Sequence, residues 1–291
     1  MDECYLCPRM CGVRRDEGEM GCCGSDDVMR IARIALHPFE EPPISGKQGS
    51  GTVFLCGCSL GCVFCQNGKI SRCEVTGEPY TPEMLAEELL ALERMGATNI
   101  NFVTGTHFTH RIAETLRLVR SELNIPVVWN SSGYERVEAL RLLEGLVDVY
   151  LPDMKYLSEE VADKYSSAPD YAKYAIPAIA EMYRQVGRYS YSEEGTLKGG
   201  VVIRHLVLPS QRKDSIEVLR RIADTVPPED VLLSLMSQYT PDFAMDSPYK
   251  ELHRRVTRFE YESVLSEAQA LGFDGFSQDM RSAVKDYTPS F

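Results

Sequence analysis

The 291-residue sequence has little positive charge and no long apolar run. Lys and Arg number 31 against 43 Asp and Glu, which gives a formal net charge of −12. A nucleic-acid-binding surface normally needs a basic stripe, and a membrane-spanning helix needs about 18 or more consecutive apolar residues. Residues 1–20 also lack the apolar stretch of a signal peptide. We therefore expect a cytoplasmic protein that binds neither nucleic acid nor a membrane.

Cysteine is absent from residues 74–291, although the chain contains ten cysteines. Disulfides are rare in the reducing cytosol, and cysteines that only pack in a core would be spread more evenly along the chain. This clustering predicts metal chemistry. The ten are Cys4, Cys7, Cys11, Cys22, Cys23, Cys56, Cys58, Cys62, Cys65 and Cys73.

Short apolar runs alternate with amphipathic segments through the middle of the chain. Several runs are apolar without alternation, which is typical of parallel strands that are buried on both faces. The pattern predicts an α/β fold with a mostly parallel sheet. A partial six-strand (β/α)6 barrel and a flat, doubly wound sheet both fit this count. The runs are 52–57, 100–104, 127–130, 147–151, 201–208 and 231–236.

Three regions follow from composition: a cysteine-rich module and connecting loop over 1–50, the barrel over 51–240, and a helical extension over 241–291. Between the strands, Thr81-Pro82 predicts a helix start and Gly96 its end. Asp214 or Ser215 is expected to cap a later helix. The long connection 156–200 contains seven tyrosines, and we expect either a lid or a packed excursion.

The first cysteine motif is Cys58-x3-Cys62-x2-Cys65, directly after the first expected barrel strand. A [4Fe–4S] cluster is usually held by four thiolates. Three local thiolates would leave one iron open to an exogenous ligand, as in a catalytic cluster. The alternative is a structural zinc site with Cys56 or Cys73 as the fourth ligand.

This motif, with Phe64 before its last cysteine, resembles that of the radical SAM superfamily. Cys65-Gln66-Asn67 is similar to the branch of glycyl-radical-enzyme activases. Further motifs resemble the uncharacterised homologues of pyruvate formate-lyase activating enzyme, and they span nearly the whole chain. They are 4–12 (CYLCPRMCG), 40–46 (EEPPISG), 49–52 (GSGT), 99–101 (NIN), 130–134 (NSSGY), 150–156 (YLPDMKY), 204–209 (RHLVLP) and 236–239 (MSQY).

The resemblance implies a partial (β/α)6 barrel with a small N-terminal metal module, and an oxidoreductase that uses a [4Fe–4S] cluster and S-adenosylmethionine (SAM). In that family the reduced cluster cleaves SAM, and the resulting 5′-deoxyadenosyl radical takes a hydrogen atom from a substrate. Implied partners are a flavodoxin or ferredoxin as electron donor and a peptide or protein substrate, with a glycyl radical in a partner enzyme as the more specific outcome. The alternatives are modification of another peptide or a small molecule, and a non-catalytic zinc or Fe–S interaction module.

The resemblance also implies cofactor-binding positions on the cluster loop and after the second strand. Phe64 would contact the adenine of SAM. Thr104-Gly105-Thr106 stands where the family has a Gly-Gly-Glu turn. This is a departure, with one glycine and no glutamate, so only a backbone contact to the methionine amino group is expected there.

Four more cofactor-binding positions match the ends of strands three to five. Asn130 occupies the place of a polar Asn-Gly turn, and Asp153 and Lys155 match the activase Asp-x-Lys. The resemblance assigns Asp153 to the ribose hydroxyls and Lys155 to the methionine carboxylate. Arg204 matches the activase arginine, whose planar fork suits a carboxylate. No catalytic residue is assigned beyond these.

The second cysteine motif is Cys4-x2-Cys7-x3-Cys11, closed by Cys22 or Cys23. The family pattern Gly-x-x-Gly-x-Cys favours Cys23. Four thiolates in a loop-rich segment fit zinc, rubredoxin-like iron or an auxiliary [4Fe–4S] cluster. The three cysteines left over are expected to be structural: Cys22, Cys56 and Cys73.

Overall fold

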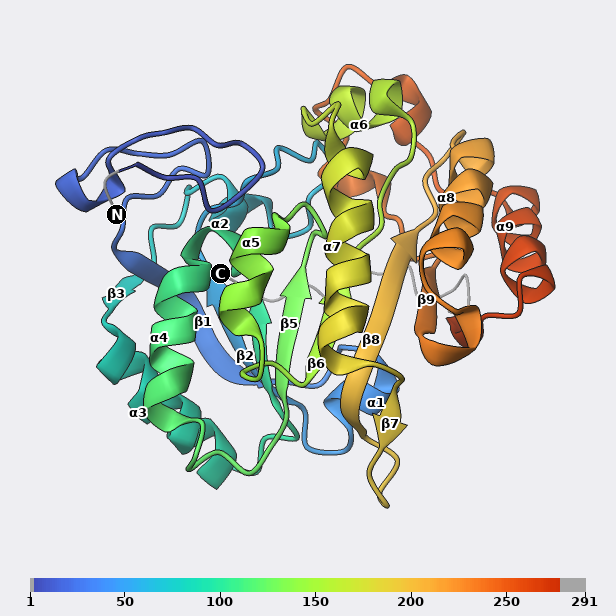
Figure 1. The fold of residues 1–291 in the computed structure, drawn as a ribbon. Helices are drawn as coiled ribbons and strands as arrows, with labels where there is room; N and C mark the ends of the chain where they lie inside the picture. Colours follow the sequence, from blue (N-terminus) through green and yellow to red (C-terminus); the bar gives the residue numbers. More distant parts are fainter. Residues whose placement is uncertain (1–2, 278–291) are drawn as a thin grey trace.

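The centre of the protein is a mostly parallel β-sheet with helices packed along it (Figure 1). The structure is a computed structural model, and it describes residues 3–277. In this part of the chain the strand order is β10-β9-β8-β6-β5-β4-β2-β1-β3, with β7 beside β8. The strands are β1 (Met29–His37), β2 (Ser50–Leu55), β3 (Glu78–Tyr80), β4 (Ile100–Val103), β5 (Val127–Ser131), β6 (Val149–Pro152), β7 (Ser190–Tyr191), β8 (Leu197–Leu206), β9 (Leu232–Met236) and β10 (Asp274–Ser277).

Each of the six predicted runs overlaps a strand, and these six strands pair in parallel from β2 through β4, β5, β6 and β8 to β9. Every residue of β4, β5, β6 and β9 is buried. Helices cover one face of the sheet and other side chains fill the opposite face, which explains why these runs are apolar without alternation.

Three strands extend the sheet beyond the predicted six. β1 pairs antiparallel with β2, and β3 pairs antiparallel with β1. β10 adds a parallel strand beside β9, in a tail that was expected to be mainly helical and that also contains α9. Its four residues Asp-Gly-Phe-Ser contain one large apolar side chain, which leaves no strand pattern to recognise. The end of the predicted extension, 278–291, lies outside the described residues.

The helices are α1 (Pro42–Ser45), α2 (Gly68–Ser71), α3 (Pro82–Arg94), α4 (Thr109–Val119), α5 (Val137–Leu140), α6 (Glu159–Ser166), α7 (Tyr171–Val186), α8 (Arg212–Thr225) and α9 (Arg258–Ala270). α3 starts as predicted, because the Thr81 hydroxyl accepts a hydrogen bond from the Met84 amide at 3.3 Å. The prediction that Asp214 or Ser215 caps α8 is wrong, since α8 begins at Arg212 and Gln211 is its N-cap residue. The Asp214 carboxylate instead accepts hydrogen bonds from the Leu157 and Ser158 amides, at 3.3 and 2.7 Å.

The tyrosine-rich connection forms α6 and α7, of which α7 packs on the sheet beside β6 and β8 and α6 packs against α7. Tyr156, Tyr165 and Tyr171 are at most 1% exposed. Their hydroxyl groups are hydrogen-bonded, with Tyr156 to Ser166 at 2.9 Å and Tyr165 to Glu251 at 2.8 Å. These contacts favour the packed excursion over a lid. Within residues 3–277, no helix combines the length and apolar character needed to cross a membrane.

Candidate functional site

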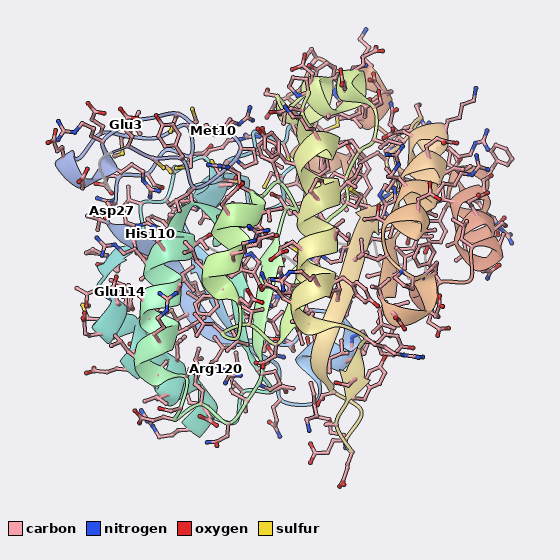
Figure 2. The ribbon with its side chains drawn as sticks, in the orientation of Figure 1. Glu3, Met10, Asp27, His110, Glu114 and Arg120 are labelled. Atoms are coloured by element: carbon pink, nitrogen blue, oxygen red, sulfur yellow. The ribbon has the colours of Figure 1, made fainter. Side chains whose placement is uncertain are left out.

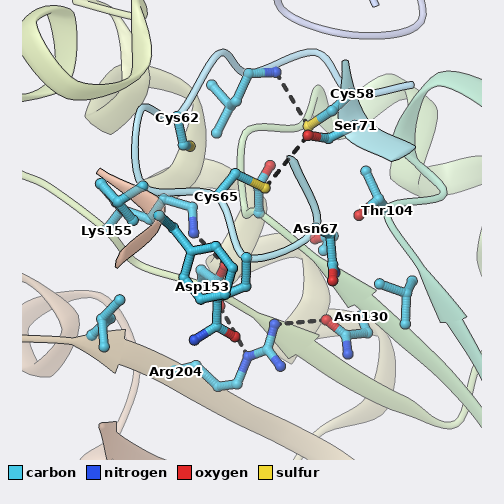
Figure 3. Close-up of a pocket in the computed structure, with 18 of the residues that line it drawn as sticks. Cys58, Cys62, Cys65, Asn67, Ser71, Thr104, Asn130, Asp153, Lys155 and Arg204 are labelled. Carbon is cyan, nitrogen blue, oxygen red and sulfur yellow. Dashed lines mark hydrogen bonds and ion pairs between the residues drawn. The ribbon is translucent and has the colours of Figure 1, made fainter. Parts of the chain in front are cut away.

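A pocket with a volume of about 260 Å³ lies where the loop after β2 meets the ends of the neighbouring parallel strands (Figure 3). The three cysteines of the first motif line it, on the loop between β2 and α2. Parallel strands end at one edge of a sheet, so side chains from distant parts of the sequence converge there. All three cysteines therefore share one pocket with side chains that follow β4, β5, β6 and β8.

Each of the three sulfurs accepts one hydrogen bond. The Leu60 amide lies 3.4 Å from Cys58 Sγ, the Ser71 hydroxyl 3.4 Å from Cys65 Sγ, and the Ser166 hydroxyl 2.9 Å from Cys62 Sγ. Hydrogen bonds to cysteine sulfur stabilise thiolate ligands and tune the potential of an iron–sulfur cluster. This donor set fits the cluster that the motif predicts.

The alternative of a zinc site on this loop needs a fourth ligand, Cys56 or Cys73. Among the described residues, no three His, Cys, Asp or Glu side chains are close enough to hold one metal ion. In a cubic cluster each cysteine ligates a different iron, so the three thiols need not converge on one point. Cys56 and Cys73, the proposed fourth ligands, do not line the pocket.

Beside the cysteines, a network of buried charged groups joins three of the predicted residues (Figure 3). Lys155 donates to Asp153 Oδ2 at 2.5 Å, and Arg204 Nε donates to Asp153 Oδ1 at 2.9 Å. Arg204 Nη2 also donates to Asn130 Oδ1 at 2.6 Å. Burial alone would raise the pKa of Asp153, but Arg204 and Lys155 hold it below its usual value. Asp153 is therefore an anion between two cations.

Phe64 and Thr104 also line the pocket. The Phe64 ring is 8% exposed and packs edge-on against Tyr239, with the ring centroids 6.1 Å apart. Thr104 has a φ of 62°, a left-handed conformation that a glycine would adopt more easily. The turn therefore places a threonine in a backbone conformation that favours glycine.

Gly105 differs from the expectation, because it does not line the pocket. A Cβ at this position would lie 2.6 Å from a ring carbon of Trp129. The absence of a side chain at Gly105 therefore allows Trp129 to pack closely against the turn. The expected contact of Gly105 with the cofactor stays a prediction.

Glu40 is a pocket residue that the sequence analysis did not select. It lies between β1 and α1 and contacts Asn101, Asn130 and Arg204. The stretch 40–46 is one of the motifs that carry the resemblance, and a carboxylate inside such a motif is the signal that could have identified it. Glu40 lies far in the sequence from the strand ends that line the pocket, so the sequence alone did not place it there.

The N-terminal module packs against the cluster loop and α4. The Cys58 amide donates to the Cys23 carbonyl at 3.2 Å, and Arg9 Nε donates to the Ser59 carbonyl at 2.8 Å. Figure 2 shows Asp27, at the end of the module, beside His110 of α4, where the two side chains are 2.7 Å apart.

The thiols of this module lie in one small region. Cys4, Cys7 and Cys23 are buried, at 5 to 6% exposure, while Cys11 is partly exposed. Burial raises the pKa of Cys7 to about 12 and also raises that of Cys23. Since no described group of three such side chains is placed to hold a single ion, a metal centre at Cys4, Cys7, Cys11 and Cys23 stays a prediction.

Known proteins resemble this chain in sequence and in fold. The sequence pattern of the radical SAM superfamily matches residues 52–222, which is more than half of the chain. An uncharacterised protein of Methanocaldococcus jannaschii is 32% identical over 279 residues, covering 93% of this chain and 75% of that protein.

Two solved structures align with this chain. The structure of Streptococcus suis SuiB bound to the precursor peptide SuiA aligns with a TM-score of 0.51 at 13% identity, over 86% of this chain and 51% of SuiB. A domain of pyruvate-formate lyase-activating enzyme from Bacteroides vulgatus aligns with a TM-score of 0.45 at 11% identity, over 62% of this chain and 98% of that domain.

The sequence match spans the cluster loop and strands β4, β5, β6 and β8, which contribute residues to the pocket or end beside it. The predicted α/β fold, with its mostly parallel sheet and a cysteine-rich N-terminal region, is confirmed. Members of this family use a [4Fe–4S] cluster and SAM, and the pocket of this chain is lined by three cysteines beside charged side chains. The chain belongs to the radical SAM superfamily of enzymes.

Proposed function

We propose that this enzyme binds SAM beside a [4Fe–4S] cluster on Cys58, Cys62 and Cys65 and abstracts a hydrogen atom from a peptide or protein substrate. The observation that carries the proposal is the shared pocket, in which three hydrogen-bonded sulfurs face the Asp153 network. When bound, the cluster and SAM supply the one-electron chemistry that generates a carbon-centred radical.

The protein's own residues bind and orient SAM. Lys155 and Arg204 provide the cationic donors for the methionine carboxylate, and Asp153 is an acceptor for the ribose hydroxyls. Asp153 is already ionised by its two neighbours, so it accepts without losing a proton. Phe64 offers an apolar ring for the adenine, and Asn130 fixes the direction of the Arg204 guanidinium.

The fold favours a peptide substrate. The structure of Streptococcus suis SuiB, which shares the fold of this chain, contains the bound precursor peptide SuiA. A peptide can present one residue at the pocket that the cysteines and the charged groups line.

Within this class, generation of a glycyl radical in a partner enzyme is the more specific candidate. It rests on the resemblance of Asp153-Met-Lys155 to the activase pattern. Modification of another peptide or a small molecule is the second candidate. The N-terminal cysteine module favours it, because the simplest activases lack such a module. In both cases a flavodoxin or ferredoxin would be the electron donor.

We also propose a second metal centre on Cys4, Cys7, Cys11 and Cys23. Three of the four thiols are buried next to one another in a loop-rich segment, and each ligand would lose its proton on binding a metal. Arg15 Nη1 lies 3.8 Å from Cys4 Sγ, so a buried cation would offset part of the negative charge of a thiolate set.

The function is tested by anaerobic reconstitution followed by EPR of the reduced protein with and without SAM. A spectrum that changes on addition of SAM is expected, because SAM would occupy the open iron. An unchanged spectrum contradicts SAM binding at the cluster. Transfer of deuterium from a labelled candidate peptide into 5′-deoxyadenosine then identifies the substrate, and a labelled small molecule gives the matching test of the second candidate.

A further inference from the structure

The floor of the pocket holds a buried carboxylate, that of Glu40, whose side chain is 10% exposed. Glu40 Oε1 accepts hydrogen bonds from Asn101 Nδ2 at 3.0 Å and Asn130 Nδ2 at 3.3 Å. Its Oε2 lies 3.6 Å from Arg204 Nη1. Glu40 is thus in contact with the same arginine and asparagine that are proposed to hold SAM.

The segment that carries Glu40 is anchored independently of these contacts. The Glu40 amide donates to the Ser45 hydroxyl at 2.9 Å, which closes the turn into α1. Asn99, just before β4, donates to the Ile44 carbonyl at 2.6 Å, and Thr98 donates to the Ser45 carbonyl at 2.9 Å. Because the loop is tied to the start of β4, it presents Glu40 to Arg204 from a fixed position.

Charges alternate along this side of the pocket, from Lys155 to Asp153, Arg204 and Glu40. Arg204 is shared between two carboxylates, at 2.9 Å from Asp153 and 3.6 Å from Glu40. The longer contact makes Glu40 the partner that a ligand can more easily replace. A ligand anion that accepts hydrogen bonds along one edge of the Arg204 guanidinium would lie close to the Glu40 carboxylate.

The other groups around Glu40 leave it able to take up a proton. Burial raises its pKa to about 7; the nearby Arg204 opposes this, while Glu41 and Asp153 add to it. β4 and β5 contribute only neutral amides. His37, at the end of β1, lines the same pocket, and burial lowers its pKa, so it is uncharged at neutral pH.

We propose that Glu40 is a positioning residue that orients Arg204 and Asn130 and takes up a proton when an anionic ligand group binds Arg204. This inference rests on the proposed function, with the SAM carboxylate as the anion. A negative charge beside Glu40 favours its protonated form. Binding is therefore coupled to proton uptake, and this contribution to SAM affinity declines as the pH rises through 7.

The test compares the SAM dissociation constants of the wild-type enzyme and Glu40→Gln between pH 6.0 and 8.5. Isothermal titration calorimetry on the anaerobically reconstituted proteins gives these constants, with iron and sulfide content measured in each. Dividing the wild-type dissociation constant by that of Glu40→Gln isolates the contribution of Glu40 to the pH dependence, because any titration of SAM itself affects both proteins equally. We expect this ratio to rise about tenfold with pH for each unit by which SAM raises the pKa of Glu40.

Glu40→Asp keeps a titrating carboxylate and should keep a rising ratio to Glu40→Gln, which a purely structural role would not produce. Glu87→Gln, an exposed glutamate of α3, is the matched control and should follow the wild type at every pH. A constant ratio overturns the inference, and a ratio that falls with pH would assign Glu40 to a cationic group. Absence of SAM binding by wild-type enzyme with an intact cluster would overturn the proposed function, and this inference with it.

Discussion

At the scale of single residues, the hydrogen bonds to the three cluster sulfurs differ in origin. The donors to Cys58 and Cys65 come from the cluster loop and α2, but the donor to Cys62 is Ser166 at the end of α6. Tyr156 is hydrogen-bonded to Ser166 in turn, at 2.9 Å. A sulfur ligand is thus tied to the tyrosine-rich segment through one hydroxyl group.

We expect Ser166→Ala to make the reduction potential of the cluster more negative. The variant removes a hydrogen bond that stabilises the extra electron on the reduced cluster. EPR-monitored redox titration measures this potential. Tyr156→Phe should give a smaller shift in the same direction, and Ser266→Ala on the exposed face of α9 should give none. Equal potentials in Ser166→Ala and wild type would contradict a role for this hydrogen bond.

Lys155→Ala should weaken SAM binding by about tenfold to a hundredfold, because a charge-assisted hydrogen bond contributes about 1.5–3 kcal/mol. Asp153 keeps Arg204 as its partner in this variant, so iron and sulfide content should stay at the wild-type level. Equilibrium dialysis with labelled SAM measures the affinity. Lys213→Ala on the exposed side of α8 is the control. Normal affinity of Lys155→Ala would assign Lys155 to the substrate or to the fold alone.

At the scale of elements, the N-terminal module supports the cluster loop through Arg9. Its guanidinium donates to the Ser59 carbonyl at 2.8 Å and to the Ser167 carbonyl at 2.6 Å. These contacts join the module, the cluster loop and the end of α6. The module therefore braces the loop on which the three cysteines lie.

Arg9→Ala should release iron from the barrel cluster faster on exposure to a chelator, because the loop loses this brace. Loss of the cluster's visible absorbance follows the release. Arg14→Ala removes a cation of the same module whose side chain is 53% exposed, and it should behave as wild type. The same rate of release in Arg9→Ala and wild type would show that the loop holds its shape without the module.

The two metal sites should nevertheless load separately. Replacing Cys58, Cys62 and Cys65 together by alanine should leave the metal of the N-terminal module in place, because its four ligands all lie before residue 24. Metal analysis of this variant and of Cys4→Ala/Cys7→Ala measures the two contents. Loss of both metals in the triple variant would contradict separate sites.

At the scale of the whole molecule, two buried histidines tie stability to pH. His107 donates to the Cys56 carbonyl at 2.7 Å, and His205 to the Met154 carbonyl at 2.6 Å. Burial lowers the pKa of His107 to about 3 and that of His205 to about 4. Neither lines the pocket, so both act as neutral packing residues.

Because both pKa values are depressed in the folded state, the unfolded chain binds more protons below pH 6.5. The stability that neutral histidine provides is therefore complete above pH 6.5 and declines as the pH falls towards 4. Each histidine should lower the free energy of unfolding by about 1.4 kcal/mol for each pH unit in this window. Urea unfolding at pH 7.5 and 5.0 measures the loss. His205→Gln should lose less between these two pH values than wild type, and an equal loss would contradict the assignment.

Local signals in the sequence were enough to predict the cluster loop and the parallel strands. Three cysteines within eight residues define one loop, and apolar runs define buried strands, because both depend on neighbours in the chain. Asp214 was predicted to cap the start of α8, and this prediction was wrong. Its carboxylate instead accepts hydrogen bonds from amides more than 50 residues away in the sequence. Gly105 was assigned to the cofactor by its position in a motif, although Trp129 is what requires it to be glycine.

The sequence by itself therefore determined the superfamily, the loop that carries the three cysteines and the six parallel strands, but not the order of the strands in the sheet. Only the tertiary structure decided what surrounds them: the Asp153–Arg204 pair, the Ser166 donor to Cys62, and Glu40 at the floor of the pocket. The physical reason is that spacing in a sequence controls which groups share a loop or a strand. Which distant groups meet depends on strand register and on the packing of loops such as 38–49, and it is these contacts that set the charge and the proton affinity of the site.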